Sequence, residues 1–185
     1  ASGYRTVAIH PFLPEFWNRN LVYPQIGFDR FIHIGNMTHR EVRGKFISDA
    51  AVAEEILDTL AAEATPAFIF AITMQNHSPY GDGRYGEVET GTVRVDLPSI
   101  SAAGVRDYVH GVRDADAMLD TLTRRLAASE RRVLLVFLGD HQPNLVPVET
   151  EPGQFSQSLR PDAVAPNIRI GRKFVGPALA WSSRG

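Results

Sequence analysis

The sequence predicts an α/β fold in which a mainly parallel sheet is sandwiched between helices. Three apolar runs of strand length predict buried strands: TVAI at residues 6–9, AFIFAIT at 67–73 and VLLVFL at 133–138. Two helical patterns lie between these runs along the chain. Helices that alternate with continuous apolar strands are typical of a parallel sheet covered on both faces.

The first long helix follows from apolar spacing and capping signals. The segment SDAAVAEEILDTLAAEA, residues 48–64, offers Ser48 or Asp49 as an N-terminal cap, and Pro66 closes it. Its apolar residues recur at helical spacing, at Val52, Ile56, Leu57 and Leu60.

A second long helix is expected from Ser101 or Val105 to Ala128. Its apolar stripe is formed by Tyr108, Val112, Ala115, Leu119, Leu122 and Leu126. The acidic residues of this helix are expected on its solvated face, namely Asp114, Asp116 and Asp120. The shorter elements expected are a helix at about 15–25, a strand at 28–34 and a last strand at 175–181.

Composition limits the function as well as the fold. The chain has 185 residues and is 44% hydrophobic, which is enough for one domain with a core and too short for two. Its formal net charge is −2 and it has no Lys/Arg-rich run, which argues against a nucleic-acid surface. Because it has no cysteine, disulfides and thiolate metal sites are excluded. No apolar run reaches the roughly 18 to 20 residues of a membrane span.

Polar side chains follow each of the three apolar strands. They are His10 after the first run, Asn76 and His77 after the second, and Asp140 and His141 after the third. In open α/β sheets, ligands bind in the crevice at the carboxyl ends of the strands. We therefore expect these residues to converge at one sheet edge, although they are far apart in sequence.

The residue types at that edge predict a metal site. Asp140 beside His141 offers a hard oxygen and a borderline nitrogen, a pair that suits Zn²⁺ or Mn²⁺ and tolerates Mg²⁺ less well. A metal there can polarise a phosphoryl or sulfuryl oxygen and lower the pKa of a bound hydroxyl.

Further residues suit an anionic substrate. His77 can hydrogen-bond a substrate or handle a proton, and the amide of Asn76 lies beside it in the sequence. Arg19 can grip an anion with its planar guanidinium, and Trp17 can supply an apolar wall.

Each of these signals also has a plainer structural interpretation. An isolated Asp-His dipeptide is weak evidence for a metal site, and Asn76 with His77 can simply cap a turn. Trp17 beside Phe16 is more often helix core than substrate wall, and Arg19 more often a solvated surface charge. The repetition of the pattern at three strand ends favours the functional interpretation over coincidence.

The segments that carry these residues resemble a known family. The chain is similar to the C-terminal two-thirds of the catalytic domain of lipoteichoic acid synthase-type phosphoglycerol transferases, in the sulfatase and alkaline phosphatase superfamily. The similarity runs from Gly3 to about Leu145, and FWNR, NHSPY and GDH in this order form a specific combination. It implies an alkaline phosphatase/sulfatase-like α/β fold, incomplete at its N-terminus, with residues 1–185 as a single domain fragment.

The resemblance also implies roles for individual residues. Asp140 and His141 would be ligands of a divalent metal, which is Mn, Mg or Zn in this superfamily. His77 would contact the phosphoglycerol or phosphate group at the catalytic centre. The substrate-binding residues around it would be His10, Trp17, Arg19 and Asn76.

Two features depart from the family's pattern. Where such enzymes often carry Gly-Asp after the first histidine, this chain has Pro11 and Phe12, which leaves a different head group open. The family's threonine nucleophile and a further acidic ligand lie upstream of the region that matches Ala1. We therefore expect a fragment that is inactive or nearly so alone, with membrane helices in the missing part. The unpaired sheet edge makes homodimerisation a hypothesis.

The function expected of the parent protein is metal-dependent transfer or hydrolysis of phosphoglycerol, or of a related phosphate or sulfate ester. Its substrates would be lipid or glycan head groups at the periplasmic or extracellular face of a bacterial cell membrane. A sulfatase is the alternative within the superfamily. The alternative from another class is a non-catalytic anion-binding module with the same fold and no nucleophile.

Overall fold

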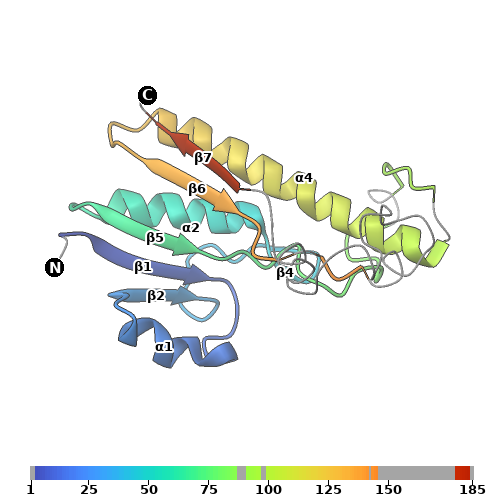
Figure 1. Cartoon of the computed structure of the whole chain (residues 1–185), viewed down its shortest axis with the longest axis horizontal. Helices are drawn as coiled ribbons and strands as arrows, with labels where there is room; N and C mark the ends of the chain where they lie inside the picture. Colours follow the sequence, from blue (N-terminus) through green and yellow to red (C-terminus); the bar gives the residue numbers. More distant parts are fainter. Residues whose placement is uncertain (1–2, 87–90, 97–98, 142, 146–177, 184–185) are drawn as a thin grey trace, which may run out of the picture. The chain divides into compact units, whose positions relative to one another are not determined.

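The computed structural model describes residues 3–86, 91–96, 99–141, 143–145 and 178–183 (Figure 1). It confirms the α/β class, with a parallel sheet and helices. The chain divides into two compact units. The first unit is Ala1–Asn76 with Gly111–Leu122, and the second is His77–His110 with Thr123–Gly185.

The sheet of the first unit contains three parallel strands. Strand β1 (Arg5–His10) lies between β2 (Arg30–His33) and β5 (Ala67–Ala71), as Figure 1 shows in blue to green. Ile9 is opposite Ile32 on one side and Ala71 on the other. The carboxyl ends of all three strands therefore meet at one edge, where His10 pairs with His33.

Helix α2 (Asp49–Ala62) covers one face of this sheet and contacts β5. Of the two caps that the sequence offers, Ser48 and Asp49, Ser48 is the N-cap, and its Oγ accepts a 3.0 Å hydrogen bond from the Ala51 amide. The core beneath it consists of Val7, Ile9, Ile32, Met37, Ile47, Ala51 and Val52. Alternation along β1 places Val7 and Ile9 on this face.

Aromatic packing on α1 (Arg19–Gln25) buries a single helix residue, Tyr23. The Tyr23 ring lies 5.3 Å from Phe28 and 4.8 Å from Phe31, measured between centroids. The helix was expected from about residue 15. It begins later because residues 16–18 form a 3₁₀ turn, η1 (Phe16–Asn18), in which Trp17 and Asn18 have positive φ angles of 60° and 52°.

A short hairpin in the first unit was not predicted. Strands β3 (Val42–Arg43) and β4 (Phe46–Ile47) pair antiparallel across a turn that includes Gly44, whose φ is 69°. Two-residue strands are too short to produce a detectable alternation in sequence.

The second unit contains a two-stranded antiparallel sheet and much of the long helix α4 (Ser99–Ala127). Strand β6 (Leu134–Leu138) pairs with β7 (Ala178–Ser182), and Val136 is opposite Ala180. The last strand was expected at 175–181; residues 175–177 lie outside the described part of the chain.

The expectation of fully buried strands is wrong for two of the three apolar runs. In β6, Leu134 is 71% exposed and Leu138 is 60% exposed. In β5, Phe68 and Phe70 are about half exposed, although Phe28 stacks near both rings. Successive strand residues point to opposite sheet faces, and in this chain the described residues cover only one face of these strands.

Within the described residues, every helix is too short or too polar to cross a membrane.

The N-cap of α2 gives a direct test of this fold. Ser48→Ala removes the acceptor of the Ala51 amide and should lower the free energy of unfolding by about 1 kcal/mol. Urea unfolding followed by circular dichroism measures the change. Asn20→Ala, at an exposed position of α1, is the control and should stay within about 0.5 kcal/mol of wild type. Equal stability of Ser48→Ala and wild type would contradict the cap.

Candidate functional site

A buried polar network holds the carboxyl end of β5 in the first unit. Gln75 is 1% exposed, and its Oε1 accepts a 2.7 Å hydrogen bond from the Asp49 amide at the start of α2. Its Nε2 donates to Oδ2 of Asp114 on α4, which also accepts from Arg43 Nε at 2.6 Å. Asp114 is therefore not simply on a solvated helix face, as its sequence position suggested. The network fixes the backbone two residues before His77.

Asn76 lies against the backbone of α4 at Gly111, within the same unit. A Cβ added to Gly111 would stand 2.1 Å from Asn76 Oδ1 and 2.2 Å from its Cγ. Only glycine leaves room for the Asn76 side chain here. Because glycine destabilises a helix interior by about 1 kcal/mol relative to alanine, its presence inside a helical pattern is the signal that could have drawn attention to Gly111.

Asp49 is a buried carboxyl group beside this network. It is 1% exposed, and its pKa is raised to about 7. Burial is the main cause, and the negative charge of Asp114 adds to it, whereas the nearby Thr73 side chain acts in the opposite direction. The charge that this group carries therefore changes near neutral pH.

The predicted pocket residues of the β1 edge have contrasting environments. His10 is 1% exposed, with Nδ1 3.3 Å from the Ile72 carbonyl oxygen. Trp17 is 76% exposed and has φ of 60°, so the plainer interpretation of this residue as helix core does not hold. A bulky residue with positive φ is an outlier, and such strain is concentrated at functional sites. Arg19 donates from Nη1 to the Phe16 carbonyl at 3.1 Å and lies over the Phe16 ring.

The second unit brings together His77 and the Asp140–His141 pair. The His77 and His141 rings are perpendicular, with centroids 6.2 Å apart. His77 is exposed, and its Nδ1 is 2.8 Å from the Ser78 carbonyl oxygen. Because a carbonyl can only accept, this contact assigns the proton to Nδ1 and makes Nε2 the acceptor of the neutral imidazole.

Asp140 and His141 follow the carboxyl end of β6, as predicted. Their side chains are 73% and 50% exposed, and Asp140 Oδ2 lies 3.6 Å from His141 Nε2. The pair supplies a carboxylate oxygen and an imidazole nitrogen, which suit two ligands of a divalent metal. Among the described residues, no cluster of three or more such side chains could hold a metal ion. The convergence of this pair with His10 stays a prediction.

Tyr80 is a further candidate site residue of the second unit, and sequence reasoning did not assign it a role. Its ring lies 5.7 Å from that of Tyr108, and the Arg84 guanidinium is 5.4 Å from its centroid. Burial raises the Tyr80 pKa to about 12, and the charges of Tyr108 and Asp140 add to this. The phenol therefore stays protonated and can donate a hydrogen bond at any physiological pH.

Comparison with known proteins places this fold and these residues in a family. The family model described as Sulfatase matches residues 1–183. The chain belongs to the sulfatase family. This membership confirms the resemblance to phosphoglycerol transferases of the sulfatase and alkaline phosphatase superfamily, because the relatives include lipoteichoic acid synthases.

Two relatives of this sulfatase-family chain are named after a glucan and after lipoteichoic acid. It is 34% identical over 182 residues to a Rhizobium meliloti protein named for cyclic beta-1,2-glucan modification, covering 98% of this chain and 28% of that protein. It is 26% identical to the lipoteichoic acid synthase of Staphylococcus saprophyticus, covering 75% of this chain and 21% of the relative. The chain thus spans about a quarter of the length of these relatives.

Solved structures of the same fold agree with this family. A Streptococcus pyogenes phosphoglycerol transferase in complex with sn-glycerol-1-phosphate has a TM-score of 0.73 at 23% identity, with 99% of this chain and 44% of that chain covered. A lipoteichoic acid synthase of Listeria monocytogenes has a TM-score of 0.68 at 21% identity, with 96% and 43% covered. At these identities the likeness shows the fold.

Replacing Gly111 tests the position of Asn76. Gly111→Ala should displace the Asn76 side chain and cost about 1–3 kcal/mol through overpacking. The matched control is Gly104→Ala in the same helix, where the new Cβ would meet Tyr80 and Leu145 atoms at an ordinary 3.6 Å. That control should be neutral or stabilising by up to about 1 kcal/mol. The Asn76 side-chain amide signals in ¹H–¹⁵N spectra report the displacement, and unshifted signals in Gly111→Ala would contradict the close approach.

The pKa of Asp49 predicts a pH-dependent stability. Because the folded pKa of about 7 is above the ordinary value of 3.8, the folded chain binds this proton more tightly than the unfolded chain. The stability should therefore fall as the pH rises from about 4 to about 7, by an amount on the order of a few kcal/mol. Asp49→Asn should remove this fall in urea unfolding measured across that range. The same slope in the variant and in wild type would contradict the assignment.

Proposed function

We propose that the protein to which this chain belongs transfers or hydrolyses a phosphoglycerol-type ester on a cell-envelope lipid or glycan. The observation that carries the proposal is the position of His77 beside the exposed Asp140–His141 pair, with the two histidine rings 6.2 Å apart. The names of the relatives support the substrate class, because they refer to a glucan and to lipoteichoic acid. The glycerol phosphate bound to the S. pyogenes enzyme supports the head group.

A divalent metal, Mn, Mg or Zn, is part of the proposal. Asp140 would offer its carboxylate and His141 its imidazole, and further ligands must come from elsewhere in the protein, since structural and catalytic sites commonly use three or more. When bound, such a metal withdraws charge from a phosphoryl oxygen.

His77 is the residue of the chain that would touch the reacting group. In its neutral form Nε2 can accept a proton, and in its charged form it can donate one to a phosphoryl or leaving oxygen. The bond from Nδ1 to the Ser78 carbonyl orients the ring for this role. Tyr80 adds a neutral hydroxyl donor in this part of the unit.

The substrate-binding residues predicted in the first unit stay proposals, each supported by its own chemistry. Arg19 suits a phosphate oxygen, and the exposed Trp17 ring suits the face of a sugar or a glycerol chain. His10 and Asn76 complete the proposed substrate-binding set. Pro11 and Phe12 depart from the family's pattern after His10, and Phe12 packs edge-on against Phe16 at 5.2 Å, so the proposal includes head groups other than plain glycerol.

We infer that the enzyme acts on the outer side of the cell membrane, in the periplasm or outside the cell. Polymers such as those named in the relatives are components of the envelope. Membrane attachment would come from other parts of the protein.

The proposal is tested on the intact protein with three probes: a chromogenic glycerol phosphodiester, a phosphomonoester and an aryl sulfate, each with Mn²⁺, Mg²⁺ or Zn²⁺. The phosphodiester should be the substrate. His77→Ala should lower kcat/KM about 10²- to 10⁴-fold, and Asp140→Ala and His141→Ala should lower bound metal. Asp116→Ala, an exposed carboxylate of α4, is the control and should change neither.

Each rival function has its own outcome. Turnover of the aryl sulfate alone would identify a sulfatase. Phosphate binding without turnover of any probe would identify the anion-binding module. Full metal content in both Asp140→Ala and His141→Ala would contradict the ligand assignment.

A further inference from the structure

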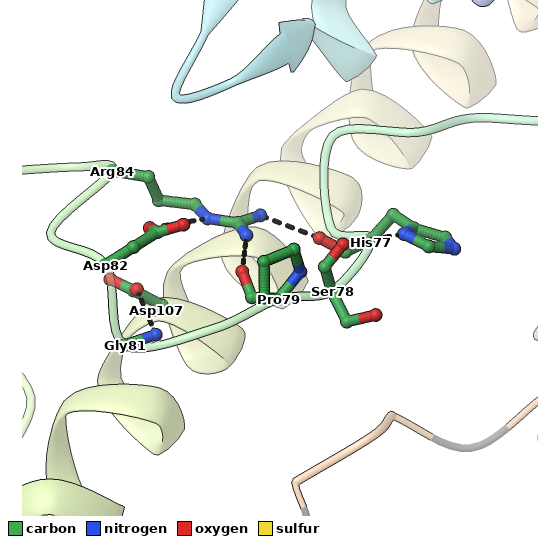
Figure 2. A network of polar contacts seen from close by, with 7 residues as sticks. All are labelled: His77, Ser78, Pro79, Gly81, Asp82, Arg84 and Asp107. Carbon is green, nitrogen blue, oxygen red and sulfur yellow. Dashed lines mark hydrogen bonds and ion pairs between the residues drawn. The ribbon is translucent and has the colours of Figure 1, made fainter.

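After His77 the chain forms a compact loop that is closed by the side chain of Arg84 (Figure 2). Arg84 Nη1 donates to the His77 carbonyl at 2.8 Å, and Nη2 donates to the Pro79 carbonyl. Its Nε is 3.4 Å from Oδ1 of Asp82. The Arg84 side chain is completely shielded from solvent. The guanidinium therefore lies inside the loop, surrounded by acceptors from the loop's own backbone.

The tip of the same loop is attached to α4. The Gly81 amide donates to Oδ2 of Asp107 at 2.8 Å, and Asp107 is 2% exposed (Figure 2). Gly81 has φ of 86°, and a Cβ there would stand 3.4 Å from the Gly104 backbone nitrogen. The loop is therefore held at its tip as well as across its base.

These contacts act on the residue that carries the proposed reacting imidazole. Arg84 holds the His77 carbonyl, and the His77 ring itself bonds to the next carbonyl, that of Ser78. The backbone of His77 and its ring orientation are therefore set by the same short segment. A planar guanidinium can donate hydrogen bonds to several acceptors in different directions at once. A lysine ammonium is a compact charge on a flexible stem and cannot replace this geometry.

Removing the guanidinium would leave the His77 and Pro79 carbonyls without this donor. Water can replace the lost donor at these carbonyls, so no side-chain contact would then close the loop across its base. The His77 imidazole would then sample many positions, including ones far from His141.

We propose that Arg84 is a positioning residue for His77, whose buried guanidinium closes loop 77–84 and fixes the imidazole next to His141. The effect of Arg84 on catalysis rests on the proposed function, because that effect requires His77 to be the reacting group. The effect of Arg84 on the position of the His77 ring does not depend on the proposed function and can be measured in this chain.

The positional test uses nuclear Overhauser contacts between the ring protons of His77 and His141. Wild type should show the cross-peak, and Arg84→Gln should lose it while the β6–β7 cross-strand contacts persist. Arg84→Lys keeps the positive charge but lacks the planar guanidinium, so it should also lose the cross-peak. This second variant keeps the test decisive if Arg84→Gln fails to fold. Arg94→Gln, at an exposed arginine, is the matched control and should retain it. Survival of the cross-peak in Arg84→Lys or Arg84→Gln would overturn the proposal.

The catalytic test uses the intact protein and a double-mutant comparison. Arg84→Gln should lower kcat about 10²-fold, with a smaller change in KM, because misplacement of a reacting group affects the chemical step. In a His77→Ala background the same substitution should have no further effect. An equal loss in both backgrounds would overturn positioning through His77. Absence of activity in wild type would instead refute the proposed function, and the cross-peak would still decide the role of Arg84.

Discussion

The buried amide of Gln75 makes the contacts on which the site loop depends. A helix leaves its first amides without partners inside the helix, and Gln75 accepts from one of these, the Asp49 amide of α2. The same side chain donates to Asp114, which is held in turn by Arg43. One residue in the segment that follows β5 thereby joins a helix start, a second helix and a hairpin. Any displacement of Gln75 would move the backbone that leads to Asn76 and His77.

Beyond His77, the chain is held by a different kind of contact. No sheet partner is present within loop 77–84, and a buried guanidinium serves its carbonyls instead. Backbone carbonyls of an irregular loop still need hydrogen-bond partners, and a side-chain donor can provide them where no neighbouring strand does. Such a loop can then hold an exposed functional side chain in place. His77 thus stands between two anchored segments, one ordered by an amide and the other by an arginine. This arrangement suits a residue that must remain exposed and still be oriented.

The sequence predicted those parts of the molecule that depend on local pattern. The α2 start at Ser48 followed from its capping chemistry, and Asp140 lies at the end of an apolar strand as expected. Gln75 and Arg84 were missed because their partners are set by the fold and by loop geometry, which leave no periodic trace. The positive φ of Trp17 was also not predictable, since the residue type disfavours it.

Native-state hydrogen exchange of the wild-type chain tests most directly whether the residues around His77 are held by buried side-chain acceptors. The relevant amides are those of Asp49, bonded to Gln75, and Gly81, bonded to Asp107. Both should exchange slowly, with protection comparable to that of the Val52 amide inside α2. Exchange of either amide at the rate of an unstructured peptide would contradict the account.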